Sequence, residues 1–96
     1  AVETPELSLG QNYPNPFNPS TTISFFLPAG CDVLLEIFDV SGKRVAVLED
    51  GPKKAGRYDI EWNGQGAGGA PASSGIYFYR LKAGKETVSR KMVLLR

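Results

Sequence analysis

Few residues of this chain could perform chemistry. The sequence contains no histidine, which removes the commonest general base and the commonest zinc ligand. Cys31 is the only cysteine, so the chain can form neither an internal disulfide nor a thiolate metal site. Ser73 and Ser74 have no base beside them in the sequence that would activate a nucleophile. We therefore expect that the protein is not an enzyme.

Acidic and amide side chains could supply general acids or calcium ligands. Glu36, Asp59 and Glu61 alternate with apolar residues in predicted strands, so we expect each carboxylate to point into solvent. The candidate calcium ligands are the loop residues Asn15, Asn18, Asp39, Asp50 and Asn63. They have no recognisable ligand spacing, and asparagine and aspartate are also common turn formers. We therefore expect neither a metal nor any other cofactor.

Two short motifs match ligand-binding patterns only formally. Residues 64–69 fit G-x-G-x-x-G, but Pro71 and a predicted strand follow where a dinucleotide site needs a helix N-terminus. Pro16 and Pro19 fit the P-x-x-P pattern of polyproline ligands. The aromatic residues that flank these prolines are better explained as anchors into the chain's own core. Neither motif therefore predicts a ligand.

Size and charge limit the classes of function. Ninety-six residues with 42% apolar content suffice for one domain with a single core. The net charge of +1 gives no overall attraction to nucleic acid, and no apolar run approaches the roughly 18 residues of a membrane span. The charges are uneven, since residues 80–96 hold six basic residues and only Glu86 as an acid. Either this segment is an ordinary solvated strand, or a partner recognises it.

Apolar and polar residues alternate with the period of two that is typical of half-buried strands. We expect strands at residues 7–9, 21–27, 32–39, 45–48, 58–62, 76–81 and 87–95. No segment has a helical period. The sequence therefore predicts an all-β fold without helix, an Ig-like antiparallel β-sandwich of about seven strands. Residues 1–8 are expected to be the end of a linker and residues 9–96 the domain, with Trp62, Met92 and Leu94 in its core.

A proline-rich loop at residues 14–19 precedes the second predicted strand. Its three prolines lack the backbone donor that a helix or an inner strand requires, so this segment must be a stiff connection. Tyr13 and Phe17 are the large apolar side chains of this region, and we expect both to pin the loop to the core. The rest of the domain is expected to be organised around this loop.

The same loop opens a series of motifs that resembles a known family. Residues 12–25 resemble the opening of the type A C-terminal sorting domains of the type IX (Por) secretion system. Four further segments match that family in the same order: 33–45 with D-x-x-G-(R/K)-x-V, 55–62 with G-x-(Y/H)-x-(I/V)-x-W, 72–81 with (A/S)-S-G-(V/I)-Y-(F/Y)-Y-R-L and 90–96 with K-(M/L)-(V/I)-x-x-(K/R). The related Ig-like domain of flagellar hook-capping proteins is also similar, particularly in the glycine-rich loop 63–75.

The resemblance implies a C-terminal sorting domain of a secreted multidomain protein from a bacterium of the Bacteroidota type. The protein would cross the periplasm, be recognised by an outer-membrane translocon, and be released or attached to the cell surface. The implied partners are this translocon, the surface-attachment machinery and the upstream cargo domain, and we expect a monomer. The implied recognition residues are Gly75, Ile76, Tyr77, Lys91, Met92, Val93 and Arg96. The basic last strand is also expected to be open to pairing with a partner.

Two alternatives remain open. The domain could be an Ig-like accessory or adhesion module of an extracellular enzyme, contacting polysaccharide through Phe26, Phe38 or one face of Tyr77 and Tyr79. It could instead be a structural assembly domain like that of the hook-capping proteins. That alternative predicts docking into a filament and a chain that continues past Arg96.

Overall fold

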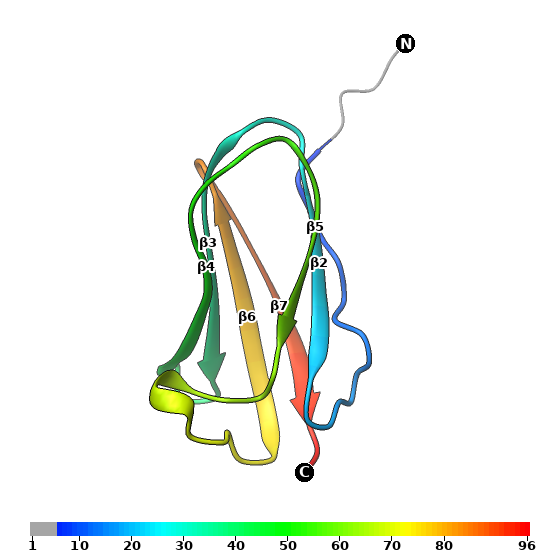
Figure 1. Ribbon diagram of the computed structural model, residues 1–96, viewed down its shortest axis with the longest axis vertical. Helices are drawn as coiled ribbons and strands as arrows, with labels where there is room; N and C mark the ends of the chain where they lie inside the picture. The colour runs from blue at the N-terminus through cyan, green and yellow to red at the C-terminus, as the bar shows by residue number, and fades with distance from the viewer. Residues whose placement is uncertain (1–5) are drawn as a thin grey trace.

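Two antiparallel sheets face each other in the computed structural model, which describes residues 6–96 (Figure 1). The three-stranded sheet has the order β1-β2-β5, and the four-stranded sheet has the order β4-β3-β6-β7. The strands are β1 (Ser8–Leu9), β2 (Thr21–Leu27), β3 (Cys31–Asp39), β4 (Arg44–Lys53), β5 (Gly56–Trp62), β6 (Gly75–Ala83) and β7 (Glu86–Leu94). Residues 6–96 contain no α-helix, only the 3₁₀ turn η1 (Ala67–Gly69). The predicted seven-stranded Ig-like sandwich is confirmed, and residues 1–5 of the expected linker lie outside the described residues.

Alternating side chains build the core between the two sheets. On β2, for example, Ile23, Phe25 and Leu27 point inward between partly exposed neighbours. The buried apolar side chains are Leu9, Phe17, Ile23, Phe25, Leu27, Val33, Leu35, Ile37, Trp62, Tyr77, Tyr79, Leu81, Ala83, Met92 and Leu94. Each large member contributes about 1.5–3 kcal/mol by leaving water. The predicted burial of Trp62, Met92 and Leu94 is confirmed.

The strand β4 is longer than the predicted segment 45–48, because it continues through Gly51 and Pro52 to Lys53. It lies at the edge of the four-stranded sheet and pairs only with β3 among the strands of residues 6–96. An edge strand tolerates Pro52, since the missing N–H interrupts no inner ladder. Its register against β3 also shifts at two points, and such irregularities are common on sheet edges.

The proline-rich loop is held by Phe17 and not by Tyr13. The Phe17 ring is 1% exposed and lies against Trp62, with 5.7 Å between the ring centroids. Tyr13, predicted to be a second anchor, is 81% exposed. Its backbone exchanges two hydrogen bonds with Thr22, and this pairing leaves the side chain in solvent. All three X–Pro bonds of the loop are cis.

The buried hydroxyl of Tyr79 fastens the start of this loop to the core. It donates a hydrogen bond to the carbonyl oxygen of Gly10, at 2.6 Å, and accepts one from the backbone N–H of Asn12, at 2.9 Å. The buried Asn12 side chain in turn donates to Thr21 Oγ1 and to the carbonyl oxygen of Pro14. Burial raises the pKa of Tyr79, so the hydroxyl remains protonated and able to donate. The loop therefore depends on polar groups that are satisfied inside the protein.

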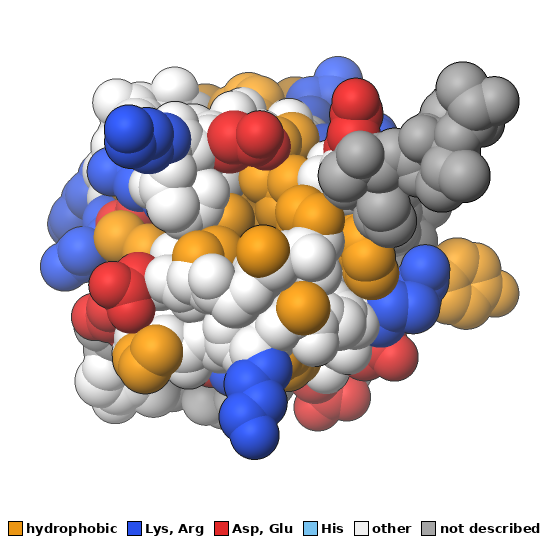
Figure 2. Space-filling model, turned by 90° about the horizontal axis from the view of Figure 1, so that it is seen from above, with side chains coloured by type: hydrophobic (Ala, Val, Ile, Leu, Met, Phe, Trp, Pro, Cys, Tyr) orange, Lys and Arg blue, Asp and Glu red, His pale blue; other side chains and the backbone are white. Residues whose placement is uncertain are grey.

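One end of the sandwich, shown from above in Figure 2, carries a small apolar recess of about 250 Å³. Apolar side chains gather near the middle of this view and charged ones surround them. Leu7, Leu27 and Ala83 line the recess together with Cys31. Cys31 is the first residue of β3 and is partly buried.

Replacement of Tyr79 by phenylalanine tests the importance of its hydroxyl. We expect Tyr79→Phe to lower the free energy of unfolding by about 1–3 kcal/mol, because the buried Asn12 N–H and Gly10 carbonyl lose their shared partner. Urea unfolding followed by tryptophan fluorescence measures this change. Tyr13→Phe is the matched control, since it removes an exposed hydroxyl from the same region. Equal stability of the two variants would contradict this role.

Candidate recognition surface

The structure brings the predicted recognition residues together at one end of β6 and β7. In the register of these strands, Gly75 lies opposite Leu94, Ile76 opposite Val93, and Tyr77 opposite Met92. Lys91 follows opposite Phe78, and Arg96 lies just beyond the end of β7. All seven residues therefore belong to one region of the fold, although they come from two segments of the sequence.

Two of the seven residues face inward and pack in the core beneath this region. Met92 is fully buried, and Tyr77 is almost so. The Tyr77 ring meets Trp62 edge-on, with 5.5 Å between the ring centroids, and its hydroxyl donates to the carbonyl oxygen of Ser73 at 2.7 Å. A partner cannot contact Met92 unless the core opens, and Tyr77 is accessible only over the small part of its ring that lines a hollow beside residues 70–77. Their role in this structure is to position the exposed residues beside them.

The side chains of Ile76, Lys91 and Val93 point outward. Ile76 and Val93 face each other across β6 and β7 on the outer surface of the four-stranded sheet, and Lys91 lies beside Phe78 on the same surface. The exposed fraction is 41% for Ile76 and 38% for Phe78. The implied recognition residues include Ile76, Lys91 and Val93 but not Phe78, although Phe78 lies within the motif of residues 72–81. The alternation of outward positions along β6 is the signal that would have found it.

The outer edge of β7 is already occupied near the end of the strand. Phe17 donates its backbone N–H to the Val93 carbonyl oxygen, and its own carbonyl oxygen accepts the N–H of Leu95, both at 3.0 Å. Asn15 Oδ1 accepts the N–H of Val93, and Gln11 Nε2 donates to the Lys91 carbonyl oxygen. The prediction that this edge is open to a partner strand is therefore wrong for residues 91–95, because the proline-rich loop pairs there.

Arg96 fastens the glycine-rich loop, residues 63–74, to the end of β7. Its backbone N–H donates to Ser74 Oγ at 2.8 Å, and its guanidinium donates to the carbonyl oxygens of Gly64, at 2.6 Å, and Ala72. Gly64 has a φ of 76°, and a Cβ there would lie 2.6 Å from the carbonyl oxygen of Pro19. Arg96 is thus engaged within the domain, through long-range contacts that no local sequence pattern indicates.

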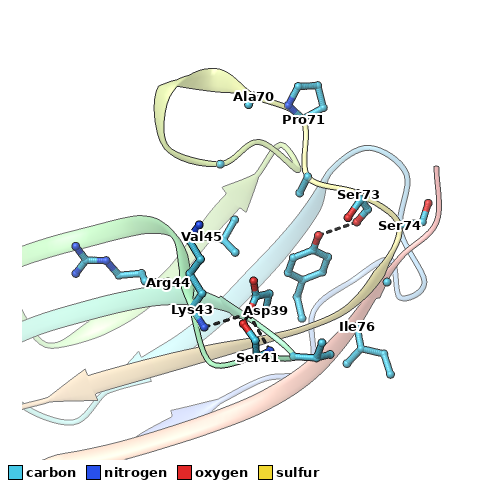
Figure 3. A pocket seen from close by; sticks show the side chains of 15 residues that line it. Asp39, Ser41, Lys43, Arg44, Val45, Ala70, Pro71, Ser73, Ser74 and Ile76 are labelled. Atoms are coloured by element: carbon cyan, nitrogen blue, oxygen red, sulfur yellow. Dashed lines mark hydrogen bonds between the residues drawn. The ribbon is translucent and has the colours of Figure 1, made fainter.

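A hollow of about 540 Å³ separates this loop from the hairpin between β3 and β4 (Figure 3). Residues 39–41 and 43–45 form one wall, and Gly66 with residues 70–77 forms the other. Asp39 Oδ1 accepts hydrogen bonds from the N–H and hydroxyl of Ser41 and from the N–H of Lys43. The bond from the Ser41 hydroxyl is the main cause of a lowered pKa of Asp39. The carboxylate therefore closes the turn between β3 and β4.

Glu36 corrects the expectation that the strand carboxylates are solvated. It lies on the outer surface of the four-stranded sheet, yet it is only 4% exposed. Arg80 Nη2 lies 3.0 Å from Glu36 Oε1, and Arg44 Nη1 lies 3.3 Å from Oε2. Burial raises the pKa of Glu36, but the hydrogen bonds and charges of the two arginines outweigh this effect, so the pKa is lowered. Cross-strand neighbours that are distant in the sequence thus cover the carboxylate.

The aromatic side chains proposed for sugar binding are largely unavailable. Tyr77 and Tyr79 point into the core, because they occupy the inward positions of β6. The guanidinium of Arg80 lies over the Phe38 ring, 4.5 Å from its centroid. Phe26 is partly buried on the opposite sheet, so these four residues do not share one exposed face.

The candidate calcium ligands mostly act as acceptors within the chain. Asn15 accepts from Val93, Asp39 closes its hairpin, and Asn63 Oδ1 accepts the N–H of Gln65. In the part of the chain that the structure describes, no group of three or more acidic or cysteine side chains is close enough to hold a metal ion.

The glycines of residues 64–69 lead into η1 and then extended backbone, so the helix that a dinucleotide site requires does not follow them. Residues 6–96 also include no helix that could cross a membrane.

The ion pairs of Glu36 predict acid sensitivity. Because its folded-state pKa is lowered from 4.5, the stabilisation is present above this pH and is lost as the pH falls below it. We expect Glu36→Gln to cost about 1 kcal/mol at pH 7, since both arginines reach solvent, and to reduce the loss of stability in acid. The melting temperature, measured at a series of pH values from about 7 to about 2.5, reports both effects. Glu61→Gln, on the opposite sheet, is the control, and an unchanged pH profile of Glu36→Gln would contradict the assignment.

The contacts of Arg96 predict a local effect on the glycine-rich loop. We expect Arg96→Ala to speed hydrogen exchange of the amides in residues 64–74 about tenfold or more, because the loop loses its links to Gly64 and Ala72. Exchange in β2 and β3 should change little. Arg57→Ala, at an exposed position of β5, serves as the control. Unaltered loop exchange in Arg96→Ala would show that these bonds do not hold the loop.

Comparisons with known proteins agree with this architecture. The family model of the FlgD Ig-like domain matches residues 14–87, whereas no curated protein matches the chain. Similar solved structures include dimeric latent PorU from Porphyromonas gingivalis, with a TM-score of 0.69 and 22% identity over 95% of this chain and 10% of PorU. Another is PorZ from the same organism, with a TM-score of 0.57 and 21% identity over 94% of this chain and 11% of PorZ. This chain spans about a tenth of either protein, and at such identities the likeness concerns the fold. The family match covers most of the chain, which therefore belongs to the FlgD Ig-like domain family.

Proposed function

We propose that this domain is a non-catalytic targeting module of the type IX secretion system. It directs a secreted multidomain protein across the outer membrane, for release or for attachment at the cell surface. The observation that carries the proposal is the position of Gly75–Tyr77 and Lys91–Arg96. The resemblance to sorting domains implies that these residues serve in recognition, and they lie side by side at one end of the sandwich.

The fold comparisons support this proposal. PorZ is an essential bacterial surface component of the type IX secretion system, and one region of PorZ has the fold of this chain. The motif series that resembles the sorting domains extends over nearly the whole chain. Together these two observations favour a module used in secretion over a general Ig-like spacer.

The translocon recognises the folded domain and not a linear peptide. Ile76 and Val93 become neighbours only when β6 pairs with β7, and Lys91 joins them through the same register. The backbone edge of residues 91–95 is paired with the proline-rich loop, so side chains provide the accessible contacts at this end. Recognition therefore depends on prior folding in the periplasm.

A structural assembly module is the second candidate function, and membership of the FlgD Ig-like family favours it. It differs from the first in a measurable way, because an assembly module binds other copies or a filament, whereas a targeting module acts as a monomer. Polysaccharide contact receives less support, since Arg80 covers the Phe38 ring and the two tyrosines are buried.

A secretion assay tests the targeting function. A fluorescent reporter with a signal peptide is fused to residues 1–96 and expressed in a bacterium with the type IX machinery and in a strain without the translocon. We expect reporter at the surface or in the medium only when the domain and the translocon are both present. Retention in the periplasm in both strains would contradict the targeting function.

The variant in this assay must preserve the fold. Deletion of residues 91–96 would remove the buried Met92 and Leu94 and would unfold the domain, so a secretion defect would be uninterpretable. Lys91→Glu changes an exposed side chain at the recognition end, and Arg57→Glu makes the same charge change on the opposite sheet. We expect the first variant to reduce secretion several-fold and the second to leave it near the unmodified level.

A further inference from the structure

The outer surface of the four-stranded sheet exposes several apolar side chains near its recognition end. Of the six large hydrophobic side chains that are exposed among the described residues, Val47, Ile76 and Phe78 lie on this surface, and Val40 follows β3 at its margin. The cross-strand register places them in adjacent rows. The outer patch, as we call it, consists of Phe38, Arg44, Val47, Ile76, Phe78, Arg80, Lys91 and Val93.

The charges of the outer patch have one sign. Arg44, Phe38, Phe78 and Lys91 form one row across the four strands, so a cation stands at each end of an aromatic pair. Glu36 and Arg80 lie in the next row, and this glutamate is already neutralised by Arg44 and Arg80. The patch therefore presents an apolar centre with surplus positive charge at its rim.

The opposite sheet has a different outer surface. Thr22, Ser24 and Phe26 of β2 face Glu61, Asp59 and Arg57 of β5 across the ladder. Ser24 also donates to Asp59 at 2.6 Å, which covers part of that row. This surface is polar and mostly acidic, with Phe26 as its single large apolar side chain among these positions. The two faces of the sandwich are thus chemically distinct.

We propose that the outer patch is a docking site for a partner protein whose surface has an apolar centre flanked by carboxylates. Surplus cations around exposed aliphatic and aromatic side chains complement such a surface in both charge and hydrophobicity. The inference deepens the proposed function. It rests on that function only for the identity of the partner, which would be a component of the translocon. Binding itself depends on Ile76, Phe78 and Lys91.

Two other occupants fit the patch less well. A sugar ring stacks on open aromatic faces, but the Arg80 guanidinium covers one face of Phe38, which leaves Phe78 as the single exposed aromatic side chain of the patch. A second copy of the domain would have to present its acidic face, and that face offers only Phe26 as an apolar centre. Both occupants are outcomes that the experiment distinguishes.

The test uses the isolated 96-residue chain labelled with ¹⁵N and defined probes. The first probe is a synthetic peptide with a central leucine and phenylalanine run flanked by glutamates, and the second has lysines in place of the glutamates. Polygalacturonate represents an anionic polysaccharide, and dilution of the domain alone reports self-association. Chemical shifts of backbone amides locate each interaction, and the domain variants are Ile76→Thr, Lys91→Glu and the control Arg57→Glu.

We expect the acidic peptide to shift the amides of Ile76, Phe78 and Arg80 and to bind at least about tenfold more tightly than the basic peptide. Ile76→Thr and Lys91→Glu should each weaken binding several-fold with an unchanged melting temperature, and Arg57→Glu should not. Equal binding of both peptides, no binding of either, shifts with polygalacturonate alone, or shifts that depend only on domain concentration would each overturn the proposal. Secretion of the fused reporter is measured separately, so failure of binding and failure of targeting are distinguishable.

Discussion

The burial of Phe17 is the interaction on which the rest of this structure depends. Its ring lies in the core against Trp62, and its backbone pairs on both sides with Val93 and Leu95 of the terminal segment. One residue thereby joins the proline-rich loop, the core and the last strand. Trp62 in turn contacts Tyr77 edge-on. The three rings of Phe17, Trp62 and Tyr77 therefore form an aromatic cluster at the end of the sandwich where the candidate recognition residues lie.

Support and contact residues alternate in the recognition region, because successive side chains of a strand point to opposite faces of the sheet. Tyr77 and Met92 face the core, whereas their neighbours Ile76 and Val93 face the solvent from the same two strands. An inward substitution would disturb the position of the outward pair. The proline-rich loop contributes in a further way, because it occupies the backbone edge of residues 91–95 and leaves side chains to determine which partner binds.

Arg80 connects the electrostatics of the outer patch with its apolar character. Its guanidinium neutralises the buried carboxylate of Glu36 and also lies over the ring of Phe38. The residue thus limits the free negative charge on this surface and removes one aromatic face from solvent. Arg44 and Lys91 lie farther out in the sheet. The result is a basic rim around Phe78 and Ile76, which differs from the acidic outer face of the other sheet.

The sequence by itself determined the all-β class and most of the core. The side chains of a strand alternate with a period of two, so the burial of Met92 and Leu94 follows from local pattern alone. Only the tertiary structure decided that Phe17 is buried and Tyr13 is not, that Glu36 lies beneath arginines, and that Arg96 holds the glycine-rich loop. These outcomes depend on which strands pair and in which register. Such pairings join residues far apart in the chain, and no local pattern specifies them.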